Sequence, residues 1–79
     1  MGLDFNVNEA IDRALKWWRR KRHKKVLWER FLARIVKDYR FQNGLDEDTK
    51  DDIFQQLDDQ RRIIRDGKGH YWVVATAVV

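Results

Sequence analysis

Apolar residues recur every three or four positions through much of the first 43 residues, and this spacing predicts α-helices. Asn6 suits the N-cap of a first helix, and Glu9, three residues later, completes a capping-box pattern. The apolar face of this helix consists of Val7, Ile11, Ala14 or Leu15, and Trp18. A second apolar face follows at Trp28, Phe31 or Leu32, Ile35 or Val36, and Tyr39. We expect the second helix to end at Asn43-Gly44, because glycine readily adopts the left-handed conformation that closes many helices.

The charged residues between these two apolar faces leave the number of helices open. Residues 19–25 are all Arg, Lys or His, which do not prevent a helix, and the two faces stay nearly in phase across them. Residues 6–42 therefore fit either one helix of about 34 residues, roughly 50 Å long, or two helices. We favour two helices with a bend near residues 21–25, because crowded like charges oppose a regular helix and a compact domain needs its elements to fold back.

The last third of the chain predicts an acidic helix followed by a β-hairpin. The helix is expected from about Asp48 to Arg61, and its candidate caps are Asp46, Asp48 and Thr49. Its thin apolar face consists of Ile53, Phe54 and Leu57. Residues 63–65 and 70–75 then flank the turn sequence Asp66-Gly67-Lys68-Gly69, a strong hairpin signal. The run Tyr71–Val79 is apolar on both faces of a strand, so we expect burial on both sides.

These elements predict one small domain over residues 1–79 of the α+β class, mainly α, with about three helices followed by a C-terminal β-hairpin. The longest apolar run, Tyr71–Val79, is too short to span a bilayer as a helix. The first residues lack the basic and apolar regions of a secretory signal, and cysteine is absent. We therefore expect a cytoplasmic protein.

The charge is strongly segregated along the chain. Residues 13–40 contain twelve Lys or Arg against two carboxylates, a net charge of +10, whereas residues 46–59 carry a net charge of −6. Residues 1–12 contribute −3 and residues 60–79 contribute +3, which gives the formal total of +4. The modest total thus hides one strongly basic and one strongly acidic segment, a pattern that suggests a polyanionic partner, an internal clamp or head-to-tail association.

The composition argues against an enzyme. The chain has no Ser and no Cys, and its two Thr have no neighbouring His, so a nucleophilic triad is not expected. His23 and His70 lack metal-ligand spacing, and the carboxylates of residues 46–52 resemble a solvated helix start more than a catalytic pair. Gly67-Lys68-Gly69 lacks the helix that follows a phosphate-binding loop. We expect no catalytic residues, no metal and no cofactor.

The basic segment instead predicts a nucleic-acid-binding domain. Dense Lys and Arg side chains neutralise phosphates and release counterions, which favours binding at low salt. Trp17 lies off the apolar face and is the best candidate to stack on an unpaired base. The candidate contacts in this segment are Lys16, Trp17, Arg19, Arg20, Lys21, Arg22, His23, Lys24 and Lys25. In a eukaryotic host or its virus the run would also fit a nuclear localisation signal, and the protein would be nuclear.

The C-terminal third resembles the end of a winged helix-turn-helix domain, in which a helix leads directly into a hairpin wing. The resemblance covers about 30 residues, from the helix at residues 48–61 to the aromatic strand Tyr-Trp-Val-Val at residues 71–74. It implies binding of double-stranded DNA, with Arg65, Lys68 and His70 as wing contacts. The chain departs from the pattern because the helix in the recognition position is acidic, and its carboxylates would repel phosphate in a major groove. These are Asp51, Asp52, Asp58 and Asp59.

A second hypothesis makes the chain a small protein-binding adaptor or inhibitor, like the regulators of viruses and mobile elements. Its contacts would be the acidic residues Asp51, Asp52, Asp58 and Asp59 of segment 46–59, or the C-terminal strand, which could add to a sheet edge. A homodimer through that strand is compatible with either hypothesis. Association with a membrane surface is not favoured, because the apolar helix faces are better explained as core.

Overall fold

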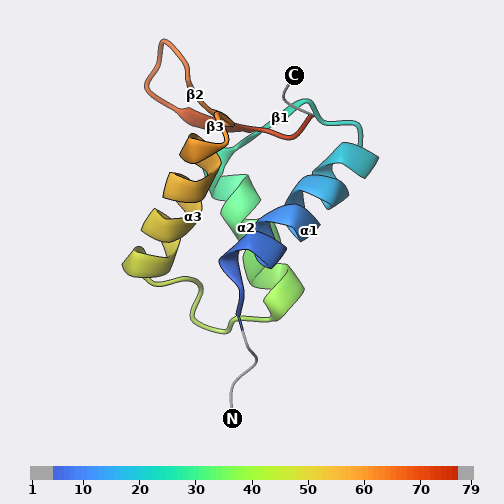
Figure 1. The fold of residues 1–79 in the computed structure, drawn as a ribbon, viewed down its shortest axis with the longest axis vertical. Coiled ribbons are helices and arrows are strands. Elements are labelled where there is room, and N and C mark those ends of the chain that lie inside the picture. Colours follow the sequence, from blue (N-terminus) through green and yellow to red (C-terminus); the bar gives the residue numbers. More distant parts are fainter. Residues whose placement is uncertain (1–4, 77–79) are drawn as a thin grey trace.

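The computed structural model describes residues 5–76 and has an α+β, mainly α architecture. Within this range the chain forms three helices, α1 (Val7–Arg20), α2 (Trp28–Tyr39) and α3 (Glu47–Asp59). It also forms three short strands, β1 (Lys25–Leu27), β2 (Ile63–Arg65) and β3 (Tyr71–Val74). The strands make one antiparallel sheet in the order β1-β3-β2, placed at one end of the three helices (Figure 1).

Residues 7–39 form two separate helices, as favoured from the sequence, and not the single long helix that was the alternative. α1 begins at the predicted N-cap, where Asn6 Oδ1 accepts a hydrogen bond from the Glu9 amide at 3.0 Å, and ends at Arg20. The chain then turns at residues 21–24, as predicted. β1 follows directly and was not predicted, because its three residues are a strand only through their partners: Val26 pairs with Val73 and Leu27 with Trp72.

Each helix ends in the same way, with an arginine in the left-handed conformation. Arg22, Arg40 and Arg61 have φ angles of 63°, 56° and 59°. In each case the amide of the following residue donates to the carbonyl five positions earlier, over 2.9–3.1 Å, as in a Schellman motif. The predicted end of the second helix at Asn43-Gly44 is therefore wrong. α2 stops earlier because Phe41 folds back against Tyr39 and Phe5, with ring centroids 5.9 and 5.3 Å away.

The acidic helix and the hairpin agree with the prediction to within two residues. Asp46, one of the three candidate caps, accepts a hydrogen bond from the Thr49 amide at 2.8 Å, and α3 ends at Asp59 instead of Arg61. In the hairpin turn the left-handed residue is Gly69, with φ of 86°. In the described part of the run, burial of β3 is uneven: Val73 is buried and Trp72 and Val74, on the opposite face, are half-buried, but Tyr71 is 37% exposed. Residues 77–79 lie outside the described range.

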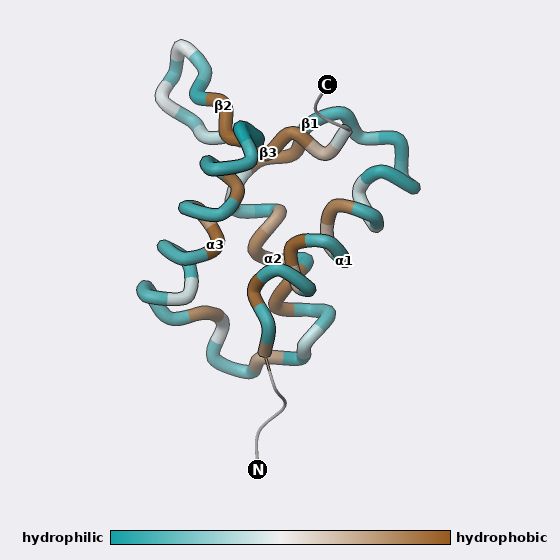
Figure 2. The backbone as a smooth tube through the Cα atoms, in the orientation of Figure 1, coloured by the Kyte–Doolittle hydropathy of each residue, from teal (hydrophilic) through white to brown (hydrophobic). Residues whose placement is uncertain are grey.

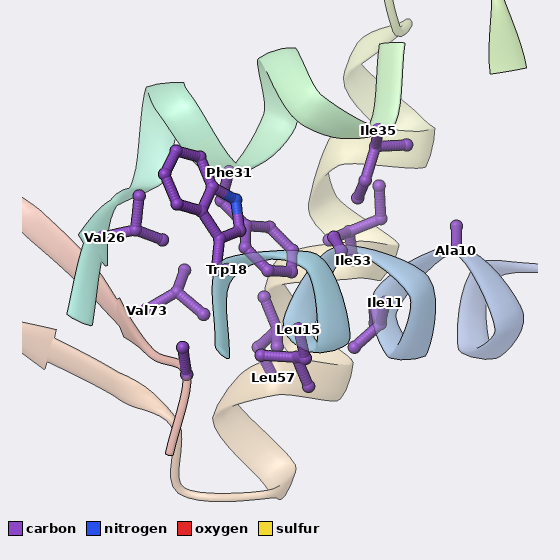
Figure 3. Packing of buried hydrophobic residues seen from close by; sticks show 12 residues of the cluster. Ala10, Ile11, Leu15, Trp18, Val26, Phe31, Ile35, Ile53, Leu57 and Val73 are labelled. Atoms are coloured by element: carbon purple, nitrogen blue, oxygen red, sulfur yellow. The ribbon is translucent and has the colours of Figure 1, made fainter. Parts of the chain in front are cut away.

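The core lies where all three helices meet the inner face of the sheet. Ile11, Leu15 and Trp18 come from α1, and α2, α3, β1 and β3 contribute the other large buried side chains (Figure 3). These are Val26, Phe31, Ile35, Ile53, Leu57 and Val73. The outer faces of the helices and the turn after α1 are hydrophilic, so the charged segments surround one apolar centre (Figure 2). None of the helices in this part of the chain is long and apolar enough to cross a membrane.

Candidate nucleic-acid interface

The basic segment begins on the last turns of α1 and continues through the turn that follows it. The backbone closes this turn by itself, since the amides of Lys21, Arg22 and His23 donate to the carbonyls of the preceding helical turn. The side chains of Lys21, Arg22 and Lys24 are exposed, whereas the His23 ring lies edge-on to Trp18 with a centroid distance of 5.0 Å. The predicted cations of the turn are therefore available to a partner, while His23 is half-buried.

A groove between α1 and α2 collects cations around two tryptophans. It has a volume of about 250 Å³ and is named here the α1–α2 groove. Its lining residues are Trp17, Trp18, Arg30, Ala33, Arg34 and Lys37. The three cations come from α2 at spacings of four and three residues, so one edge of the helix presents them together.

Cation–π contacts fix the arrangement of the groove. The Arg34 guanidinium lies 4.4 Å from the centroid of the Trp17 ring and is held there by Asp38, whose Oδ1 accepts from Arg34 Nη2 at 2.6 Å. Lys21 Nζ lies 5.5 Å from the same ring, and the Arg30 guanidinium lies 5.4 Å from Trp18. Trp17 is half-buried by these neighbours, so it is less exposed than its place in the sequence predicted.

The other predicted cations of the segment lie beside this groove or support the fold. Lys16, Arg19 and Arg20 surround a shallow hollow on the outer side of α1. Arg19 Nε also donates to the Ala75 carbonyl at 2.8 Å, which ties α1 to the chain after β3. Lys25 Nζ lies 4.5 Å from the centroid of the Trp72 ring, on the outer face of the sheet. Arg19 and Lys25 thus have structural contacts in addition to their charge.

The hairpin turn does not join the basic groove. Arg65 lies over the Tyr71 ring at 5.7 Å, and Lys68 occupies the turn itself, where His70 is also exposed. The turn and the C-terminal end of α1 lie at opposite ends of the sheet (Figure 1). The structure therefore separates the predicted wing contacts from the predicted contacts of residues 16–25.

Asp66 organises this hairpin turn. Its Oδ1 accepts hydrogen bonds from the amides of Lys68 and His70, both at 2.9 Å, and its Oδ2 accepts one from Trp72 Nε1 at 3.0 Å. The Trp72 hydrogen bond, followed by the one from the His70 amide, lowers the pKa of Asp66 from its ordinary value of 3.8. The charged carboxylate is therefore the form that the folded turn prefers.

We expect the hairpin turn to loosen as the pH falls below about 3.8. Because the folded pKa of Asp66 lies below its ordinary value, the carboxylate stabilises the turn above that value, and this contribution is lost as the pH falls through the folded pKa. The Trp72 indole proton, followed by NMR, reports the change locally. A local signal is needed because the pKa of Asp46 is also lowered, by its hydrogen bond with Thr49. A measurement of global stability would therefore combine the effects of both carboxylates. In Asp66→Asn the Trp72 signal should no longer depend on acid pH; an unchanged titration would contradict this role.

The acidic residues of α3 lie on surfaces apart from the groove. Asp51, Asp52, Asp58 and Asp59 are exposed, and none of them forms an ion pair with another residue of the described range. Phe54, on the same helix, lies edge-on to both Trp28 and Tyr71, with centroid distances of 5.3 and 5.2 Å. A pocket of about 180 Å³ adjoins these rings. Its lining residues are Leu27, Trp28, Glu29, Gly69, His70 and Tyr71.

Sequence reasoning missed the contribution of α2 to the basic surface. Arg30, Arg34 and Lys37 were counted in the net charge but were not named as contacts, because the dense run at residues 19–25 stood out more. Their spacing on the side of the helix away from Phe31 and Ile35 was the signal that could have revealed them.

Residues 5–76 contain no group of three or more His, Asp or Glu side chains placed to hold a metal ion. No protein-family model, curated protein or solved structure matches the chain.

Proposed function

We propose that this domain binds nucleic acid through the cations of α1, the turn at residues 21–24 and α2. The observation that carries the proposal is that almost none of these cations forms an ion pair with a carboxylate of the described residues. Of the twelve Lys and Arg in residues 13–40, only Arg34 is within 4.0 Å of a carboxylate of the described chain. Eleven cations grouped on adjoining elements favour a polyanion, because each phosphate they neutralise releases counterions.

We further propose that the domain is similar to a winged helix but docks differently. The direct passage from α3 into the β2–β3 hairpin supports the resemblance. The exposed carboxylates of α3 argue against inserting this helix into a major groove, where they would meet phosphate. The α1–α2 side of the domain is therefore the surface proposed to face nucleic acid, with Arg65 and Lys68 on the hairpin as separate, secondary contacts.

A salt titration of binding tests this proposal. We expect fluorescence anisotropy to show submicromolar binding of labelled duplex DNA or single strands at low salt. On duplex DNA, a plot of the logarithm of the association constant against the logarithm of the salt concentration should have a slope of about −0.9 per phosphate contact. With six contacts, the affinity should drop on the order of 10³-fold between 50 and 200 mM salt. Absence of binding at the lowest salt would sink the proposal.

A second candidate function is binding of a basic protein segment at the acidic side. The specific observation is that the exposed Asp51 and Asp58 lie on the same stripe of α3 as Phe54, beside the pocket lined by Trp28, Glu29 and Tyr71. Carboxylates next to aromatic faces suit Lys or Arg side chains, which pair with the former and lie over the latter. A labelled arginine-rich peptide in the same assay separates the candidates: binding of the peptide without binding of DNA would favour the second.

A further inference from the structure

The α1–α2 groove contains a hydrogen-bond donor that the fold leaves unused. Trp18 lines the groove and is only 5% exposed, and its Nε1 has no hydrogen-bond partner within the described chain. The indole nitrogen lies on the side of the ring that faces α2 (Figure 3). Buried donors are almost always paired in folded proteins, so this indole N–H is free to take an acceptor that the chain itself does not supply. Nε1 exposes almost no surface, and an external acceptor therefore reaches it only when the side chains that cover it move.

The same groove offers an aromatic face next to cations. One neighbour of the Trp17 ring, Arg34, is fixed by Asp38, but the other, Lys21, is exposed and lies 5.5 Å away without a carboxylate partner. Lys21 can therefore move aside and give a flat group access to the ring. Arg30 and Lys37 remain available at the rim, because neither is paired with a carboxylate of residues 5–76.

These three features together match the chemistry of a nucleotide. The base of a nucleotide provides a flat face for Trp17 or for the guanidinium of Arg34, oxygens of the sugar, the phosphate and most bases accept hydrogen bonds, and the phosphate is anionic. A base within a duplex has both faces covered by stacked neighbours, so it cannot present a face to the groove without leaving the helix. The arrangement therefore favours an unpaired nucleotide over a base pair.

We propose that the α1–α2 groove binds one unpaired nucleotide of single-stranded DNA or RNA. The base stacks at Trp17, the phosphate contacts Arg30 and Lys37, and an oxygen of the nucleotide accepts from Trp18 Nε1. This inference rests on the proposed function and adds a preference for unpaired nucleotides to it. Other cations of the basic segment contact the phosphates of the nucleic acid on either side of this nucleotide.

The first test compares Trp17→Ala with Trp17→Phe on three probes, a short oligothymidylate, a short oligouridylate and a DNA duplex. Base–aromatic stacking predicts that Trp17→Ala weakens binding of the single strands between about 5-fold and about 150-fold and leaves duplex binding unchanged. Trp17→Phe keeps a stacking ring and should retain most of the affinity. A loss confined to one single strand would still support the groove and would show that it distinguishes the two nucleotides, which differ in the sugar and in the C5 methyl group of the base.

A second test needs no substitution, so it remains decisive if Trp17→Ala fails to fold. Adding oligothymidylate to the wild-type protein should shift the NMR signal of the Trp18 indole N–H and slow its exchange with solvent. The Trp72 indole N–H is a control inside the same molecule, because it already donates to Asp66; its signal should not move.

The outcomes separate this inference from the proposed function. Equal losses on duplex and single strands in Trp17→Ala, or an unmoved Trp18 signal while oligothymidylate is bound, would overturn the nucleotide site and leave nucleic-acid binding intact. A wild-type protein that binds none of the three probes at low salt would overturn both.

Discussion

Replacing Arg20, Lys21, Arg30 and Lys37 together by glutamine is expected to weaken duplex binding on the order of 10³-fold at 0.1 M salt. If each cation neutralises one phosphate, each raises the logarithm of the association constant by about 0.9 at 0.1 M salt, and the four increments add. The slope of log K against log salt should fall by about 3.6 in magnitude. Anisotropy titrations over a range of salt measure both quantities. None of these four side chains forms a hydrogen bond or ion pair with another residue of the described range, so their replacement should leave the fold intact.

A matched variant controls for net charge. Lys50, Arg61, Arg65 and Lys68 lie outside residues 13–40, and replacing them by glutamine removes the same four charges from other surfaces. This variant should lose much less affinity and keep most of the salt slope, with any remaining loss measuring the hairpin contacts. Equal losses in the two variants would mean that binding follows overall charge and has no footprint on α1 and α2. Circular dichroism of both variants checks that the helices are intact.

Phe31→Ala is expected to lower the free energy of unfolding by about 3–5 kcal/mol, the usual cost of removing a buried aromatic ring from a well-packed core. Phe31 is fully buried and belongs to the cluster in which α1, α2, α3 and the sheet meet (Figure 3). A domain of 79 residues has a total stability of about 4–12 kcal/mol. The substitution should therefore remove from about a quarter of the total stability to all of it. Urea denaturation followed by tryptophan fluorescence measures the loss.

Ile64→Ala provides the comparison for this core substitution. Ile64 is 44% exposed on β2, so its replacement should change the free energy of unfolding by less than about 1 kcal/mol. Similar losses in Phe31→Ala and Ile64→Ala would contradict the assignment of Phe31 to the centre of the core.

The elements with strong local signals could be predicted from the sequence, and those that depend on distant partners could not. The start of α1 follows from Asn6 and Glu9, and the hairpin follows from its glycine turn, because these signals act over three or four residues. β1 has only three residues and no local signal, since its strand conformation comes from pairing with β3 more than forty positions later. The early end of α2 likewise depends on packing between Phe41 and Phe5.

The sequence predicts which segment of the chain is basic, but it does not predict the groove that part of this segment forms. The net charge of +10 over residues 13–40 identifies the segment, yet the sequence places its densest part at the turn, where the side chains of Lys21, Arg22 and Lys24 extend into solvent. The groove arises only when α2 packs against α1, which brings Arg34 to Trp17 across seventeen positions. A helical spacing reveals the cations of α2, but the partner they meet is set by the tertiary fold.

Two of the left-handed arginines that close the three helices are positions where stability and affinity call for different residues. A non-glycine residue in that conformation is less stable than glycine by on the order of 1 kcal/mol, so Arg22, Arg40 and Arg61 are natural positions for raising thermal tolerance. At Arg61 such an exchange removes a charge outside the basic segment of residues 13–40. At Arg22 and Arg40 it removes a cation of the proposed interface, so selection for heat resistance and selection for affinity would favour different residues at these two positions.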